Sequence, residues 1–226
     1  MTRLILDQKL NEISQDVSIL EEMVKQAMLS AVSALKERDI NTSKHIYEAD
    51  IRINEKRYAI EHECITTIAT QQPLAVDLRI LASILEVSTE LERMGDYAKG
   101  IAKINLLLKE EELLKQVGYL PEMAEMAVSM LDQAVRAFTA QDMRAAEAIP
   151  QQDDEVDRIY NAMYRDLMEY VMQHPESFDQ ANLLMWAAHN IERTADRVTN
   201  ICERTLFICT GEIRELDVSL DELLSR

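Results

Sequence analysis

A long apolar seam at the start of the chain constrains its fold more than any other feature. The apolar residues between positions 3 and 36 follow one another at steps of three and four, which places them on one narrow stripe of an α-helix. The seam comprises Leu10, Ile13, Val17, Leu20, Val24, Ala27, Ala31 and Leu35. Only four Gly and four Pro occur in 226 residues, so the chain has few places to turn. We therefore expect long helices with a polar outer face.

The same periodicity predicts five further helices and no β-strand. They are expected over residues 42–70, 74–108, 121–140, 142–172 and from 178 to about 210, with Asn41 or Thr42 capping the second helix and Pro150 bending the fifth. Because helices one to three resemble helices four to six, we expect an all-α fold of two tandem three-helix bundles related by a pseudo-twofold axis. The predicted boundaries are 1–112 for the first bundle, 113–211 for the second and 212–226 for a polar acidic tail.

Composition limits the classes of function. The net charge of −17 argues against nucleic acid and anionic lipid as partners, and fits a protein that binds metal cations or basic partner surfaces. The chain has no apolar stretch long enough to span a bilayer, and Asp7 and Lys9 interrupt its start too early for a secretory signal. We expect a cytoplasmic protein whose three cysteines are mostly small buried residues. The long apolar seams also suggest a homodimer.

One short acidic stretch occurs twice. Glu92-Arg93-Met94-Gly95-Asp96 returns 100 positions later as Glu192-Arg193-Thr194-Ala195-Asp196. Residues four apart on a helix point the same way, so each Glu/Asp pair presents two carboxylates together. With 41 acidic residues in the chain, a single such pair is expected by chance, and most such pairs are solvated. The shared context of the two copies indicates a duplicated scaffold.

The preceding helix of each half adds further oxygen ligands. Asp50 and Asn54 in the first half, and Asp153 and Asp157 in the second, have the same four-residue spacing. If the two helices of each pair pack antiparallel, four oxygen side chains converge, which suits a hard cation. The candidate metal ligands are Asp50, Asn54, Glu92 and Asp96 in a first cluster, and Asp153, Asp157, Glu192 and Asp196 in a second cluster.

Two other classes compete with a metal-binding regulator. In the first, the chain is a structural helical adaptor whose acidic pairs bind nothing. In the second, it is a di-iron carboxylate enzyme, but that site needs Glu-x-x-His motifs, and no histidine here has a Glu three positions before it. His189 is either an accessory ligand near Glu192 or a histidine at the rim of the core. We therefore expect no catalytic residues and no organic cofactor.

The doubled motif, the upstream acidic pairs and the late Thr210-Gly211-Glu212 resemble the PhoU family of phosphate-signalling regulators. The resemblance covers residues 3 to about 215. It implies two three-helix bundles and multinuclear sites for divalent or trivalent metal ions, such as iron, zinc, manganese or magnesium. It also implies a negative regulator of the phosphate-starvation response that links the phosphate-specific ABC transporter to a sensor histidine kinase. Asn54 replaces an Asp that is frequent in the family, which weakens the first cluster.

Overall fold

The computed structural model describes residues 2–108 and 112–216, and every regular element within them is a helix. The first half contains α1 (Thr2–Glu37), α2 (Ile40–Gln71) and α3 (Val76–Leu107). The second half contains α4 (Leu120–Ala140), α5 (Met143–Ala148), α6 (Asp153–Gln173) and α7 (Phe178–Thr210). Short 3-10 turns connect these helices over Lys115–Tyr119, Pro150–Gln152 and Pro175–Ser177.

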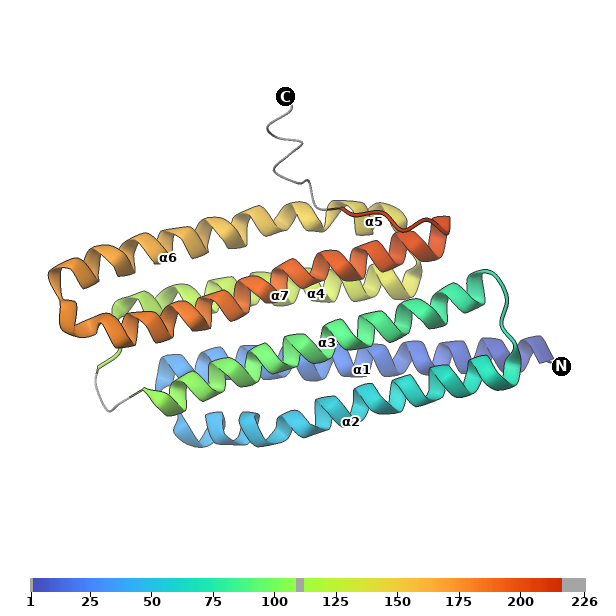
Figure 1. Cartoon of the computed structure of the whole chain (residues 1–226), viewed down its shortest axis with the longest axis horizontal. Coiled ribbons are helices and arrows are strands. Elements are labelled where there is room, and N and C mark those ends of the chain that lie inside the picture. Colours follow the sequence, from blue (N-terminus) through green and yellow to red (C-terminus); the bar gives the residue numbers. More distant parts are fainter. Residues whose placement is uncertain (1, 109–111, 217–226) are drawn as a thin grey trace, which may run out of the picture.

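The helices form two bundles that pack side by side (Figure 1). Helices α1, α2 and α3 make the first bundle, while α4, α7 and the broken helix α5–α6 make the second. The break lies at Pro150, as expected, because proline cannot donate the helical hydrogen bond at that position. Helices α3 and α7 run in opposite directions along the contact between the bundles. The predicted all-α fold of two three-helix bundles is confirmed.

The apolar seam of α1 forms the centre of the first bundle. Val17, Leu20, Val24 and Leu35 are completely buried. Burying such side chains contributes about 1.5–3 kcal/mol each relative to exposure, so the seam is a principal source of stability. Since it is used within the chain, it no longer supports the predicted homodimer. In the part of the chain that the structure describes, no helix is both long and apolar enough to cross a membrane.

Buried Asn105 near the end of α3 fixes the turn between α1 and α2. Its side-chain amide donates to the backbone oxygens of Ala34 at 2.9 Å and Asp39 at 3.2 Å, and to Ser43 Oγ at 2.8 Å. Asp39 also caps α2 by accepting from the Thr42 backbone N–H at 2.9 Å. The cap predicted at Asn41 or Thr42 was therefore wrong, because the helix begins at Ile40, earlier than the apolar pattern indicated.

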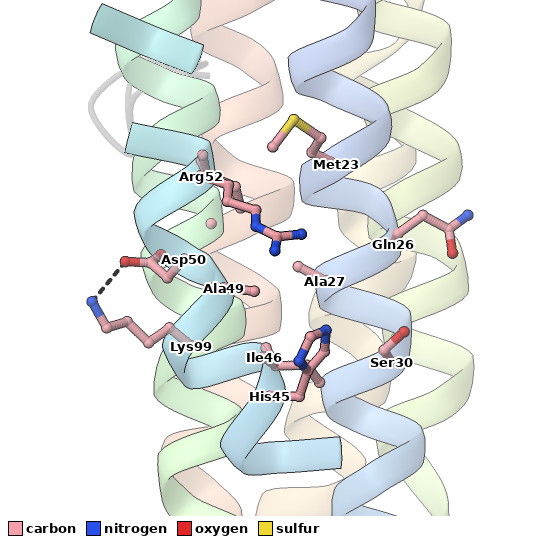
Figure 2. A pocket seen from close by; sticks show the side chains of 12 residues that line it. Met23, Gln26, Ala27, Ser30, His45, Ile46, Ala49, Asp50, Arg52 and Lys99 are labelled. Atoms are coloured by element: carbon pink, nitrogen blue, oxygen red, sulfur yellow. Dashed lines mark hydrogen bonds and ion pairs between the residues drawn. The ribbon is translucent and has the colours of Figure 1, made fainter. Parts of the chain in front are cut away.

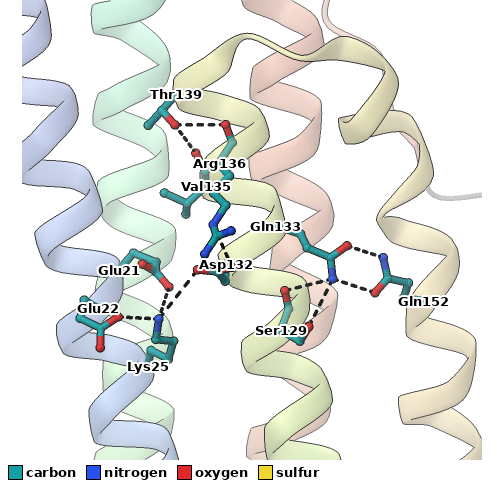
Figure 3. Close-up of polar contacts among 10 residues, drawn as sticks. All are labelled: Glu21, Glu22, Lys25, Ser129, Asp132, Gln133, Val135, Arg136, Thr139 and Gln152. Atoms are coloured by element: carbon teal, nitrogen blue, oxygen red, sulfur yellow. Dashed lines mark hydrogen bonds and ion pairs between the residues drawn. The ribbon is translucent and has the colours of Figure 1, made fainter.

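Charged side chains also join the two bundles across α1 and α4 (Figure 3). Lys25 on α1 lies 3.8 Å from both Glu21 Oε1 and Asp132 Oδ1 of α4. Arg136 pairs with the same Asp132 at 3.0 Å. The second bundle is therefore tied to the first by ion pairs as well as by apolar packing.

One residue of the predicted acidic tail, Leu216, packs against the core, whereas residues 212–215 are exposed. The Leu216 backbone N–H donates to Glu203 Oε1 at 2.9 Å, and its half-buried side chain contacts the core. Residues 217–226 of that tail, and residues 109–111 near the predicted domain boundary, lie outside the described residues. The boundaries at 112 and 211 remain predictions.

Candidate metal centre

Each half places its acidic residues where two consecutive antiparallel helices face each other. In the first half these are α2 and α3, and in the second half α6 and α7. Gly95 lies between Glu92 and Asp96 of α3, and a Cβ on Gly95 would come within 3.0 Å of Ile53 Cδ1 on α2. The missing side chain therefore allows α2 to approach α3 closely, which explains why the motif carries a small residue before its Asp.

The first cluster contains an internal cation. Asp50 is 5% exposed, and its Oδ2 accepts from Lys99 Nζ at 2.7 Å and from Asn54 Nδ2 at 3.4 Å. Lys99 Nζ also lies 3.9 Å from Asp96 Oδ1 (Figure 2 shows the Lys99–Asp50 pair). Asp50 Oδ1 is buried and has no hydrogen-bond donor. The ammonium of Lys99 thus neutralises part of the charge that a metal ion was predicted to balance.

The acids of the first cluster interact with one another and with two cations, Lys99 and Arg57. Burial raises the pKa of Glu92, with further increases from Asp96 and Asp50, while Arg57 opposes the shift. The pKa of Asp96 is raised by burial and then by Asp50, and Lys99 lowers it. Asp50 of α2 thus interacts electrostatically with both carboxylates of α3.

The second cluster carries more uncompensated acid. Burial, followed by repulsion from Asp196, Asp157 and Glu192, raises the pKa of Asp153 to about 7. Its Oδ1 is buried without a hydrogen-bond donor. Burial also raises the pKa values of Asp157 and Glu192, and Asp196 adds to the shift of Glu192. Asp153 thus interacts electrostatically with each of the other three predicted acids of α6 and α7.

His189 lies at the edge of the second cluster. Its Nδ1 is 3.0 Å from Glu192 Oε2, and its ring lies near those of Trp186 and Tyr160 at centroid distances of 6.4 Å. The side chain is 42% exposed, so it is a rim histidine rather than a core residue. Trp186 is the only tryptophan of the chain, which makes it a spectroscopic reporter of this cluster.

The two clusters differ in how well they fit a hard cation. Four carboxylates and a buried carboxylate oxygen without a donor suit such an ion in the second cluster. The first cluster also has a buried carboxylate oxygen without a donor, at Asp50, but an amide takes the place of one carboxylate and the ammonium of Lys99 adds a positive charge. Within residues 2–108 and 112–216, no group of three or more His, Cys, Asp or Glu side chains is already placed to hold a metal ion. Binding would therefore require side chains to turn towards the ion.

The arginines of the doubled motif do not pair with Glu92 or Glu192; Arg93 contacts Glu90 on its own helix, and only Arg193 reaches the other half. Arg93 Nη1 lies 3.3 Å from Glu90, and the Arg193 guanidinium on α7 stacks 4.7 Å from the Tyr97 ring centroid on α3. Sequence reasoning missed Lys99 and Arg57, which oppose the acids of the first cluster. Lys99 follows Asp96 by three positions, a helical pairing distance that could have revealed it.

Comparison with known proteins supports the relation between the halves. The PhoU domain model matches residues 17–104 and again 120–205. The phosphate-specific transport system accessory protein PhoU homolog of Streptococcus pneumoniae TIGR4 is 33% identical over 211 residues, covering 93% of this chain and 98% of that protein. The homolog of Aquifex aeolicus is 34% identical over 208 residues, covering 92% of this chain and 94% of that protein.

Two solved structures are also similar to this chain over nearly its whole length. The crystal structure of the phosphate transport system regulatory protein PhoU from Streptococcus pneumoniae superposes with a TM-score of 0.86 at 33% identity, covering 94% of this chain and 100% of that one. PhoU from Pseudomonas aeruginosa gives a TM-score of 0.85 at 28% identity, with 91% and 99% coverage. Family model, relatives and architecture agree over nearly the whole length, and the chain belongs to the PhoU family.

Proposed function

We propose that this chain is the accessory regulator of a phosphate-specific ABC transporter. The observation that carries the proposal is the match of the family's domain to both halves, together with relatives named as accessory proteins of phosphate-specific transport. In this role it keeps the phosphate-starvation response off when phosphate is plentiful, by relaying the state of the transporter to a sensor histidine kinase in the cytoplasm. It acts by protein contact and not as an enzyme, in keeping with the word "accessory" in those names.

A genetic experiment tests the regulatory role. In the native host, loss of this chain should switch on a phosphate-starvation promoter in phosphate-rich medium, and re-expression should switch it off again. The transporter's subunits should co-purify with the tagged chain from membranes. A promoter that stays off in the deletion strain would contradict the proposal. A Cys209→Ala variant, altered at an exposed position outside both clusters, provides the control.

We also propose that the second cluster binds a divalent or trivalent metal ion such as iron, zinc, manganese or magnesium. The proposal is supported by Asp153, whose Oδ1 is buried without a donor and whose pKa is raised to about 7, first by burial and then by the negative charge of Asp196, Asp157 and Glu192. Asp153, Asp157, Glu192 and Asp196 would hold the ion, which would supply the positive charge that stabilises four ionised carboxylates side by side. It would thereby strengthen the contact between α6 and α7.

Elemental analysis of protein purified without chelator or His tag tests metal binding. The combined Glu192→Gln and Asp196→Asn variant should lose metal while its helical circular dichroism is kept. Addition of Mn²⁺ to metal-free wild-type protein should change Trp186 fluorescence, through the His189–Glu192 contact, and the variant should not respond. Glu122→Gln combined with Glu125→Gln on α4 is the charge-matched control. Equal metal content in all three proteins would overturn the site, and a metal-free adaptor would replace it.

A further inference from the structure

The two halves differ at two positions beside their acidic clusters. The 100-residue offset that aligns Glu92 with Glu192 also aligns Lys99 with Thr199. The offset of 103 residues that aligns Asp50 with Asp153 pairs Arg57 with Tyr160 in the same way. Both cations near the first cluster therefore have uncharged counterparts in the second half.

Lys99 occupies the space between the two helices that supply the first cluster. Its ammonium donates to Asp50 of α2 at 2.7 Å and lies 3.9 Å from Asp96 of α3. The same group is 5.4 Å from the Tyr47 ring centroid, a further contact that favours a cation. Asn54 turns its amide N–H towards Asp50, so it acts as a donor to the carboxylate. Both donors occupy Oδ2 of Asp50, so a metal ion that bound Asp50 would have to use Oδ1 beside this ammonium or displace the donors from Oδ2.

The corresponding space in the second half is open. A hollow of about 350 Å³ is lined by Thr199 together with Asp153 and Asp196. Arg197, which also lines it, is engaged with α3: its Nη1 lies 2.7 Å from Glu90 and its Nε lies 2.6 Å from the Tyr97 hydroxyl. Arg193 stacks on the same tyrosine. The hollow therefore has room beside Asp153 for a cation.

We propose that Lys99 is a built-in counter-ion that takes the place of a metal ion in the first cluster, so that this chain binds metal only in its second half. The proposal rests on the proposed function in taking the second cluster as a metal site. Its physical basis is repulsion between the Lys99 ammonium and any metal cation brought to Asp50 and Asp96. The contact between α2 and α3 is then independent of metal, whereas the contact between α6 and α7 responds to it.

Transfer of the cation between the halves is the first test. Thr199→Lys introduces an ammonium at the position equivalent to Lys99, beside Asp153 and Asp196. In titrations of metal-free protein with Mn²⁺, followed by calorimetry and by electron paramagnetic resonance of the free ion, this variant should lose the bound Mn²⁺ and the Mn²⁺-dependent shift of the melting temperature. Thr199→Gln, similar in reach but uncharged, should retain both. Full Mn²⁺ binding by Thr199→Lys would overturn the proposal.

The converse test opens the first cluster in a background where the second is disabled by Asp153→Asn and Asp196→Asn. Adding Lys99→Thr with Asn54→Asp should create Mn²⁺ binding that the background lacks. Lys103→Thr with Asn54→Asp, which removes a different lysine of α3, should bind no Mn²⁺. Absence of binding in the well-folded Lys99→Thr protein would overturn the inference. If the Lys99→Thr protein gains Mn²⁺ binding although the wild-type chain binds no Mn²⁺, the result would support the role of Lys99 as a counter-ion and would reject the metal site of the proposed function.

Discussion

Arg197 of α7 donates to Glu90 of α3 across the contact between the two bundles, with 2.7 Å between Nη1 and Oε2. Glu90 is only 8% exposed, and Asn200 Nδ2 donates to the same Oε2 at 3.2 Å. Arg197 also donates through Nε to the hydroxyl of Tyr97. A charged network thus lies between the halves.

Replacement of Arg197 by Ala should destabilise the protein by roughly 2–3 kcal/mol, because it removes a charged hydrogen bond from a buried carboxylate. The free energy of unfolding from urea denaturation measures the effect. Arg93→Ala is the matched control, since Arg93 contacts the same Glu90 at 3.3 Å but its side chain is 51% exposed. That change should cost under about 1 kcal/mol. Equal losses for both variants would contradict the central role of the Arg197 pair.

Glu21 should make stability depend on pH. Burial raises its pKa above the ordinary value, with Lys25 opposing the shift. Below about pH 4 the group is protonated in both folded and unfolded chains. As pH rises, Glu21 ionises at a lower pH in the unfolded chain than in the folded one. The free energy of unfolding therefore falls, and it continues to fall until the pH has passed the raised pKa of the folded state. Glu21→Gln should therefore become progressively more stable than wild type as pH increases from about 4 towards 7, in urea denaturation series at several pH values.

The neighbouring Glu22 provides a control of opposite sign. Hydrogen bonds from Lys25 and Gln26 lower its pKa. A carboxyl group whose pKa is lowered in the folded state stabilises the protein at pH values above its ordinary pKa. That stabilisation disappears as the pH falls through the lowered pKa. Relative to wild type, Glu22→Gln should thus lose stability as pH rises, with a small amplitude because the side chain is exposed. The same trend in both variants would refute the assignment of the pH dependence to burial of Glu21.

Asn105→Ala should destabilise the turn between α1 and α2. Three acceptors, the Ala34 and Asp39 carbonyls and Ser43 Oγ, lose their donor in a buried site. We expect a loss of roughly 2–3 kcal/mol in the free energy of unfolding. Asn41→Ala, at an exposed position of the same turn, should change stability by less than about 0.5 kcal/mol. A small effect at Asn105 would mean that water replaces its hydrogen bonds.

The three cysteines should react at very different rates. Cys64 and Cys202 are buried, and burial raises the pKa of each thiol to about 12, so little thiolate forms at neutral pH. Cys209 is exposed. In native protein, a disulfide reagent such as dithionitrobenzoate should therefore modify one thiol rapidly, and all three after denaturation. Cys209→Ser should remove the rapid phase; its persistence would show that a buried thiol becomes accessible through local opening.

Local sequence patterns predicted the helices well because their cause is local. The seam of α1 and the break at Pro150 follow from side-chain periodicity and from the missing proline donor. The doubled acidic motif was equally visible, since four-residue spacing fixes the direction of Glu92 and Asp96 on one helix. The Asp39 cap was missed because Asp39, Asn41 and Thr42 are all competent caps, and only backbone geometry selects one of them.

The sequence by itself determined the class of fold, the internal repeat and the two sets of acidic residues, because these depend on periodicity and composition. Only the tertiary structure decided which charges meet. It brings Lys99 against Asp50, 49 positions away, and Arg197 against Glu90, 107 positions away. Such contacts depend on how helices pack and on how far a long side chain reaches, which spacing along one helix does not specify. The physical difference between the two halves lies in those contacts and not in the motif that they share.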